Sequence, residues 1–231
     1  MTDEKFLDQK MDRREFLKKA GIGGAGLALG LSGASAFFAN QDSSSKNAYD
    51  GDEDISFFGK HQAGITTPMQ KACYLVVLDL HTTDKKDVIQ LFKDWTDYSS
   101  KLVEGQLVKK DGANALLPPK DTGETVGLNP YRLSLTFGVS ADFLKKLGLE
   151  SKRPKLFRDL PPFPKEQLQD KYMGGDIVIQ ACADDEQVAF HAVRNLIRKG
   201  RNKITMKWSK SGFAAIGDRK ETPRNLFGFK D

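Results

Sequence analysis

The sequence predicts an α+β protein in which a four-stranded antiparallel sheet carries helices on one face. Three observations predict this class. Four runs have strand character, two segments between them place apolar residues at helical spacing, and loops rich in Gly and Pro separate them. The resulting order is strand, helix, strand, short helix, strand, helix, strand. Two strand–helix–strand units in this order favour a sandwich of one sheet and one helical layer.

The first strand and the first helix are predicted from residues 74–102. Residues 74–80 form a nearly continuous apolar run, which is typical of a central strand buried on both faces. Asp84 is placed to cap a helix, and apolar residues including Trp95 then recur at helical spacing until Leu102. We expect Trp95 to lie in the core. Residues 105–130, rich in Gly, Pro, Asp and Asn, are predicted to form a loop region.

The middle of the chain predicts a second strand and a long surface segment. Residues 132–139 alternate between polar and apolar side chains, which indicates a half-buried strand. A short helix is expected over 142–147, ended by Gly148. Residues 152–175 are rich in Pro, which disfavours helices and inner strands, so an extended surface segment is predicted.

The third strand, the second long helix and the fourth strand follow. Residues 176–183 form the third strand, and a capping sequence at 184–187 starts a helix that runs to Arg198, with Gly200 just past its end. His191 shares a polar stripe with Arg194 and Arg198, so we expect it to be solvated. The alternating residues 204–209 form the fourth strand.

This order is the split βαβ pattern of a ferredoxin-like sandwich, in which strands one and three lie side by side and antiparallel. That arrangement brings Cys73, at the start of one strand, near Cys182, at the end of the other. Two cysteines exclude a disulfide framework. A bridge directly across two strands would be strained, so both are expected to be thiols packed as small strand residues; a single bridge is the alternative in an exported protein.

Composition and charge limit the function. At 231 residues, with 39% hydrophobic and 29% charged residues, the chain is typical of a globular protein with a sizeable core. The formal charge is +5, of which the first 19 residues contribute one, and the rest is dispersed along the chain. This charge is too small and too scattered to predict binding to nucleic acid.

The N-terminus has the form of a twin-arginine export signal. Arg13-Arg14-Glu15-Phe16-Leu17-Lys18 precedes an uncharged stretch rich in Gly and Ala, and residues 34–36 fit a cleavage site. Asp12 departs from the Ser or Thr usual before the arginines. We assign residues 1–36 to a signal peptide, 37–56 to a polar linker and 57–231 to the ferredoxin-like domain. A membrane anchor is the alternative, which the many glycines of this stretch disfavour.

Four separated segments together carry a resemblance to a known family. They are 58–65 (FGKHQAGI), 160–164 (LPPFP), 174–183 (GGDIVIQACA) and 225–231 (NLFGFKD). In this order they resemble the dye-decolourising (DyP-type) haem peroxidases, specifically the exported deferrochelatase/peroxidase branch, and the twin-arginine leader fits that branch. The resemblance covers most of the chain after residue 57.

The resemblance implies a fold and a site. The family has two ferredoxin-like domains in tandem and haem b, and a Gly-x-x-Asp-Gly turn of the first domain covers the haem. Carried over, Asp231 matches the distal aspartate that moves a proton between the two oxygens of hydrogen peroxide. Gly228 would let the backbone approach the porphyrin, and Phe229 would pack near its face.

The sequence ends inside that motif, and this has consequences for binding. The axial histidine is expected beyond residue 231, and none of His61, His81 and His191 matches the family's motif, so no metal ligand is assigned here. We expect the 231-residue chain to be truncated and inactive alone, with an apolar sheet face left exposed.

Two functions of different classes follow. The first is an exported haem-dependent peroxidase that oxidises an electron donor with hydrogen peroxide, or a deferrochelatase that releases iron from haem for iron supply. Its expected partners are the twin-arginine machinery, iron-uptake proteins and a second copy of the chain, and its location is secreted, periplasmic or on the outer face of the cytoplasmic membrane. The second is a non-catalytic ferredoxin-like module for binding or dimerisation.

Overall fold

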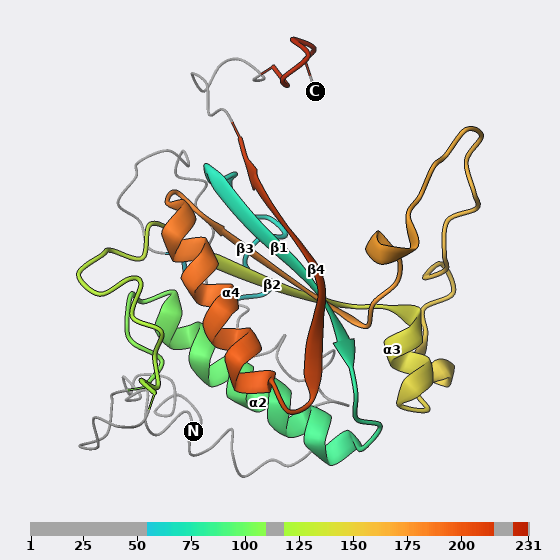
Figure 1. The fold of residues 1–231 in the computed structure, drawn as a ribbon, viewed down its shortest axis with the longest axis horizontal. Helices are drawn as coiled ribbons and strands as arrows, with labels where there is room; N and C mark the ends of the chain where they lie inside the picture. Colours follow the sequence, from blue (N-terminus) through green and yellow to red (C-terminus); the bar gives the residue numbers. More distant parts are fainter. Residues whose placement is uncertain (1–54, 110–117, 215–223, 231) are drawn as a thin grey trace, which may run out of the picture. The chain divides into compact units, whose positions relative to one another are not determined.

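The computed structural model describes residues 55–109, 118–214 and 224–230. The sheet comprises β1 (Ala72–Leu80), β2 (Ser134–Val139), β3 (Ile177–Ala183) and β4 (Ile204–Phe213). The strands follow the order β2-β3-β1-β4, and every neighbouring pair is antiparallel (Figure 1). The predicted ferredoxin-like order, with strands one and three adjacent at the centre, is confirmed.

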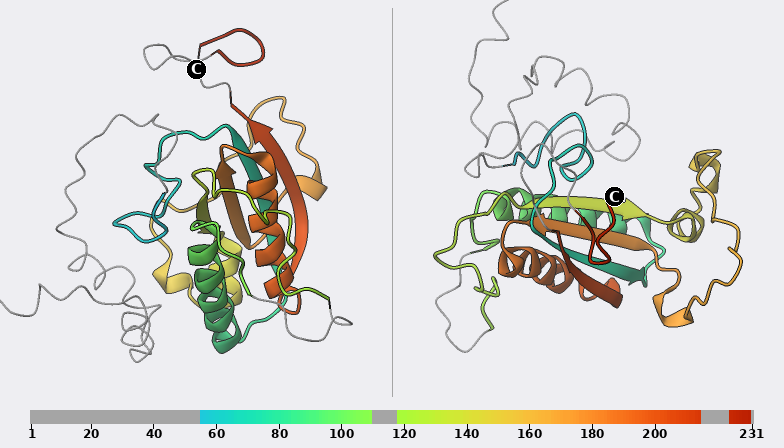
Figure 2. Two further views of the ribbon diagram at one scale, coloured as in Figure 1. Left: turned by 90° about the vertical axis from the view of Figure 1, so that its left-hand side faces the viewer. Right: turned by 90° about the horizontal axis from the view of Figure 1, so that it is seen from above.

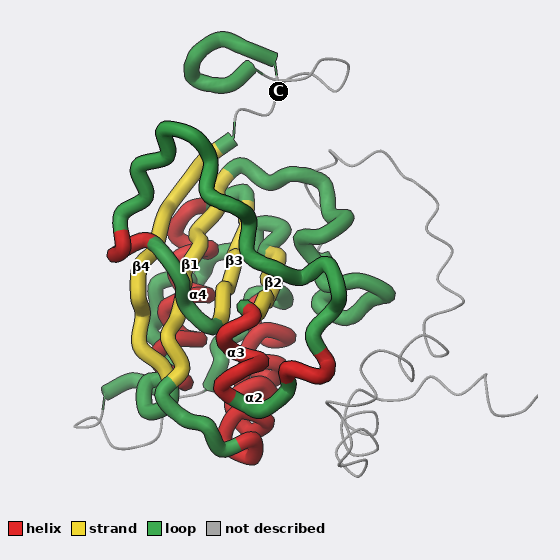
Figure 3. Tube along the Cα trace, turned by 90° about the vertical axis from the view of Figure 1, so that its right-hand side faces the viewer, coloured by secondary structure: helices red, strands yellow, loops and turns green. Residues whose placement is uncertain are grey.

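Two long helices cover one face of this sheet. They are α2 (Lys85–Leu102) and α4 (Glu186–Gly200), which lie side by side (Figure 2, left). The short helix α3 (Ala141–Lys146) lies at one end of the sheet in a view onto the opposite face (Figure 3). Two 3₁₀ turns, η2 (Glu150–Lys152) and η3 (Asp170–Tyr172), interrupt the exposed segment between α3 and β3. No helix in the described ranges is both long and apolar enough to span a bilayer.

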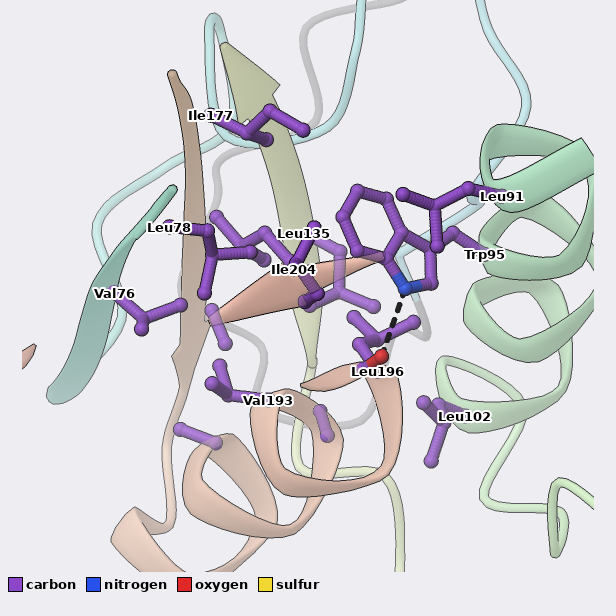
Figure 4. Close-up of a cluster of buried hydrophobic side chains, with 14 of the residues drawn as sticks. Val76, Leu78, Leu91, Trp95, Leu102, Leu135, Ile177, Val193, Leu196 and Ile204 are labelled. Carbon is purple, nitrogen blue, oxygen red and sulfur yellow. Dashed lines mark hydrogen bonds between the residues drawn. The ribbon is translucent and has the colours of Figure 1, made fainter. Parts of the chain in front are cut away.

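The core lies between the sheet and these two helices. Along β3, buried residues alternate with half-buried ones, as a strand with one face against helices requires. Trp95 is 1% exposed, and its indole N–H donates to the carbonyl oxygen of Leu196 at 2.8 Å (Figure 4). Its ring also stacks on Phe137. Trp95 therefore joins α2, α4 and β2, and its predicted place in the core is confirmed.

Side-chain caps begin the three α-helices of the described ranges, at the predicted starts of α2 and α4 and one residue before the predicted start of α3. The Asp84 carboxylate accepts from the Lys86 amide at 2.8 Å, and the Ser140 hydroxyl accepts from the Phe143 amide at 3.1 Å. Asp185 accepts from two amides at the start of α4. These contacts satisfy amide groups that have no partner inside the helix.

Two strand boundaries differ from the prediction because charged residues form ion pairs instead of extending the strands. Arg132 has a φ of 55° and pairs with Asp184 at 3.1 Å, so β2 begins at Ser134. Asp176 is 2% exposed and accepts from the Leu80 amide at 2.7 Å and from Lys146 at 2.6 Å, so β3 begins after it. β4 is longer than predicted, since it pairs with β1 as far as Phe213.

The prediction that Gly200 lies past the end of α4 is wrong. Gly200 is the last residue of the helix, and Arg201 is its C-cap in the right-handed helical region. A Cβ at Gly200 would lie 2.9 Å from Ile204 Cγ1 and 3.0 Å from Leu91 Cδ1. Glycine is needed there because β4 and α2 approach the helix closely, not because the chain turns.

The expected solvation of His191 is also wrong. His191 is 2% exposed, and its Nδ1 lies 2.7 Å from Glu124 Oε2 while its Nε2 lies 3.5 Å from Asp121 Oδ1. Glu124 also pairs with Arg194 at 2.7 Å. The loop 121–124 thus covers the polar stripe of α4, and these contacts fix the loop to the helix.

We expect Glu124→Gln to weaken the fold in a pH-dependent way. Burial would raise the pKa of Glu124, but hydrogen bonds from Thr122 and His191 prevail and lower it from 4.5 to about 2. The ionised carboxylate therefore stabilises the fold above pH 4.5 and loses this contribution as the pH falls towards 2. The variant should lose about 1–2 kcal/mol of unfolding free energy at pH 7 and show a flatter acid limb in urea titrations. Glu150→Gln, at an exposed position, is the control; an equal loss there would contradict the assignment.

The open face of the sheet, for which the sequence predicts an apolar surface, carries apolar and polar residues together. Residues paired across the strands share a face, and those of this face include Leu75, Val77, Val178 and Trp208 beside Thr136, Gln180 and Lys210. The 62–70 segment also reaches this face. The Thr136 hydroxyl donates to the Ala63 carbonyl at 2.6 Å, and the Gln70 amide donates to the Ser134 hydroxyl at 2.8 Å.

The 62–70 segment also forms hydrogen bonds with the outer edge of β2. The Gln62 side chain accepts from the Phe137 amide at 2.9 Å and donates to its carbonyl at 3.0 Å. Gly64 follows with a φ of 94°, and a Cβ there would lie 1.9 Å from Thr136 Oγ1. Part of the 58–65 motif therefore has a structural role.

Gly64→Ala is expected to destabilise the fold by about 2–4 kcal/mol, because it adds a clash with the Thr136 side chain to an unfavourable φ. Gly123→Ala is the matched control, since Gly123 has a φ of 79° and a Cβ added there would meet nothing within 4 Å. It should lose about 1 kcal/mol. Urea unfolding of both variants measures the difference, and equal losses would show that the contact with Thr136 has no effect.

Candidate functional site

The candidate site is the C-terminal loop, which we define as residues 224–230. The Asn225 side-chain oxygen accepts from the amides of Phe227 and Phe229 at 3.0 and 3.1 Å. The Gly228 amide donates to the Asn225 carbonyl at 2.9 Å, and Arg224 donates to the Gly228 carbonyl at 2.8 Å. An Asn at this position folds a loop locally because its side chain replaces backbone acceptors. The C-terminal loop is therefore organised by its own sequence.

Gly228 has a φ of 82°, a region that residues with a side chain rarely adopt. A Cβ at this position would meet nothing within 4 Å. The backbone conformation therefore requires glycine at residue 228, and the space beside it is empty.

The C-terminal loop presents apolar side chains to solvent. Leu226, Phe227 and Phe229 are 88%, 86% and 69% exposed. Three such side chains on one short loop indicate a surface that another group covers, because large apolar groups gain free energy on leaving water. Of the three predicted site residues, Gly228 and Phe229 lie together in this loop, and Asp231 lies outside the described residues.

Two of the three histidines of the described ranges have side-chain partners. His61 lies at an exposed loop position, His81 is hydrogen-bonded to the Thr205 hydroxyl, and His191 is buried between carboxylates. In the same ranges, no cluster of three or more His, Cys, Asp or Glu residues could hold a metal ion. The apolar surface of the C-terminal loop suits contact with a flat apolar group such as a porphyrin.

Two other motifs of the sequence lie outside this loop: 174–183 packs against β1, and 160–164 lies at the surface. A Cβ at Gly175, whose φ is 113°, would lie 2.2 Å from Val77 Cγ1, so this glycine lets the chain pass close to β1. Leu160 and Phe163 of the 160–164 motif are 78% and 54% exposed. The structure also pairs Cys73 directly with Cys182, as the predicted strand order implied.

Comparison with known proteins identifies the family. Residues 62–214 match the family model described as Dyp-type peroxidase, N-terminal, and the chain belongs to this family. It is 37% identical over 182 residues to a deferrochelatase of Yersinia pseudotuberculosis, covering 76% of this chain and 41% of that protein. It is 34% identical over 225 residues to a deferrochelatase of Escherichia coli, covering 95% of this chain and 52% of that protein.

Solved structures agree with this assignment. A DyP-type peroxidase from Streptomyces coelicolor superposes with a TM-score of 0.68 at 34% identity, covering 78% of this chain and 48% of that one. Ferric DtpA from Streptomyces lividans gives 0.67 at 34% identity, with the same coverage. The predicted family and fold are confirmed. The chain spans about half the length of the curated relatives that it matches.

Proposed function

We propose that this chain is the N-terminal domain of a haem-dependent enzyme that uses hydrogen peroxide to oxidise an electron donor, releases iron from haem, or does both. The observation that carries the proposal is the C-terminal loop, where Gly228 has a positive φ and Phe229 is exposed. The family match and the deferrochelatase relatives support the chemistry.

Each site residue has a distinct role in this proposal. Haem b, when bound, would supply the redox-active iron. Phe229 packs near the porphyrin face, and Gly228 allows the backbone to come close to it. The Asp231 carboxylate accepts the proton from one peroxide oxygen and returns it to the other, because heterolysis of the O–O bond requires this transfer. The axial histidine is contributed by polypeptide beyond residue 231.

We also propose export by the twin-arginine route, with residues 1–36 as the signal peptide and 37–56 as the linker. The basis is the sequence pattern, which lies outside the described residues. Iron-uptake proteins and a second copy of the chain are the proposed partners. Replacing Arg13 and Arg14 by lysine should retain the protein in the cytoplasm, and unchanged export on cell fractionation would overturn this assignment.

Hemin titration tests the site. The 231-residue chain alone should bind hemin weakly, without a sharp Soret shift, because the axial histidine is proposed to lie on polypeptide beyond residue 231. We define the complemented protein as this chain joined to the part of the Escherichia coli relative that it does not match. That protein should bind hemin stoichiometrically and consume peroxide. A sharp stoichiometric shift with peroxide turnover by the chain alone would contradict the assigned division of roles.

Product analysis of the complemented protein separates the two activities. Intact protoporphyrin with free iron would identify iron release, whereas an oxidised donor with haem retained would identify peroxidase activity. If neither product forms although hemin binds, the chain is a binding or dimerisation module.

A further inference from the structure

Cys73 and Cys182 form a directly opposed pair on the central strands of the sheet. Cys73 of β1 is the register partner of Cys182 of β3. Residues paired in this way project from the same face, so both thiols lie on the face opposite α2 and α4. Both residues are free cysteines and half-buried. The proposed haem chemistry uses neither of them.

The two thiols differ in acidity. A hydrogen bond with Cys182 outweighs burial and lowers the pKa of Cys73 from 9.0 to about 7. The same hydrogen bond, together with burial, raises the pKa of Cys182. Cys73 is therefore the more acidic of the two thiols and Cys182 the less acidic, which suits a nucleophilic thiol and its resolving partner.

A cavity gives small molecules access to this pair. It has a volume of about 360 Å³, and both cysteines line it. Polar residues of the 62–70 segment, of β3 and of the position before β1 line it as well, namely Thr67, Gln70, Gln180 and Lys71. A water molecule occupies about 30 Å³, so the cavity has ample room for hydrogen peroxide.

We propose that Cys73 and Cys182 are a peroxide-oxidisable dithiol that closes to a disulfide across β1 and β3. The Cys73 thiolate attacks one oxygen of hydrogen peroxide, the O–O bond breaks, and the leaving hydroxide becomes water by taking a proton from solvent, which replaces the one that Cys73 released on ionising. Cys73 is then a sulfenic acid. The Cys182 sulfur attacks the Cys73 sulfur, the S–O bond breaks, and the hydroxyl leaves as water with the Cys182 proton. Two thiols are oxidised and one peroxide is reduced to two waters.

The strand geometry permits this closure. Opposed residues of antiparallel strands have Cα atoms about 4.5–5.5 Å apart, within the range of about 4.4–6.8 Å that disulfides span. Their Cβ atoms are about 4.5–5.5 Å apart, slightly more than most disulfides allow, so closure draws the strands together. A bond formed under such strain is readily reduced, which is typical of labile rather than structural disulfides.

The test uses the full chain, reduced and free of haem, with excess hydrogen peroxide at pH 7. Thiol titration should show both thiols lost together, and peptide mapping should find one intramolecular Cys73–Cys182 bond that dithiothreitol reverses. In Cys182→Ser, dimedone should trap a sulfenic acid on Cys73. In Cys73→Ser, loss of the remaining thiol should be slower than in Cys182→Ser, because burial still raises the pKa of Cys182 when Cys73 is absent.

Iodoacetamide labelling of the unmodified chain is independent of any folding defect in these variants. Cys73 should be labelled well before Cys182 at pH 7. Equal labelling of both thiols, two thiols remaining after peroxide treatment, or disulfides only between chains would overturn the proposal. Because no haem takes part, failure of hemin binding would leave this result unaffected.

Discussion

Asp231→Ala in the complemented protein is expected to lower the rate of peroxide consumption by about 10²–10⁴-fold, the range that a positioned acid–base group contributes. The loss follows because no other group assigned to the site moves the proton between the two peroxide oxygens. Haem absorption should be unchanged, since the carboxylate is not proposed to hold the iron. Steady-state kinetics and the Soret band measure the two effects separately.

Two further variants sharpen this result. Asp231→Asn keeps the size of the side chain without its basicity and should be as slow as the alanine variant. Lys93→Ala, at an exposed position of α2 outside the candidate site, should leave turnover unchanged. Full peroxide turnover by Asp231→Ala would remove the aspartate from the proposed chemistry, whereas loss of haem binding in that variant would assign it a structural role.

Trp95→Ala is expected to have the largest effect on stability, about 3–5 kcal/mol, because it empties a fully enclosed site among α2, α4 and β2. Besides the hydrogen bond to Leu196, it removes an edge-to-face contact with Phe92 at a centroid distance of 5.4 Å and a stacked contact with Phe137 at 5.7 Å. The free energy of unfolding in urea measures the loss.

A pair of conservative variants isolates the hydrogen bond of the indole. Trp95→Phe keeps an aromatic ring but leaves the Leu196 carbonyl without this donor, at a loss of about 1–2 kcal/mol beyond the volume change. Trp208→Phe is the control, since the buried N–H of Trp208 has no acceptor within the described residues. A loss for Trp208→Phe equal to that for Trp95→Phe would show that the bond to Leu196 adds nothing.

The parts of the fold that the sequence predicts are those that local patterns determine. Asp84 precedes an amphipathic run, and the spacing of Trp95 along that run places it on the inner face of α2. The pairing of Cys73 with Cys182 follows from the order of the elements alone. Gly228 and Phe229 are assigned from the family resemblance, and both lie in one loop that Asn225, only a few residues away, folds.

The wrong predictions share a different cause. His191 has polar neighbours on its face of the helix, and this pattern predicts exposure to solvent. Glu124, which is 67 residues away in the chain, nevertheless contacts its ring. Gly200 stands where a glycine usually ends a helix, but it is required because Ile204 and Leu91 leave no room for a side chain. The coverage of the open sheet face by the 62–70 segment is equally non-local. Periodicity does not reveal which distant segment packs against a given face.

The two hydrogen bonds between the Gln62 side chain and the Phe137 backbone affect how copies of this chain can associate. An outer strand with free amide and carbonyl groups is a template onto which a foreign strand can add, and it is a common origin of fibrous aggregates. At Phe137 both groups are already occupied by one glutamine. The opposite margin of the sheet, β4, carries Lys207 and Lys210, and lysines there repel an identical incoming strand. Both margins thus disfavour continuation of the sheet from one copy to the next.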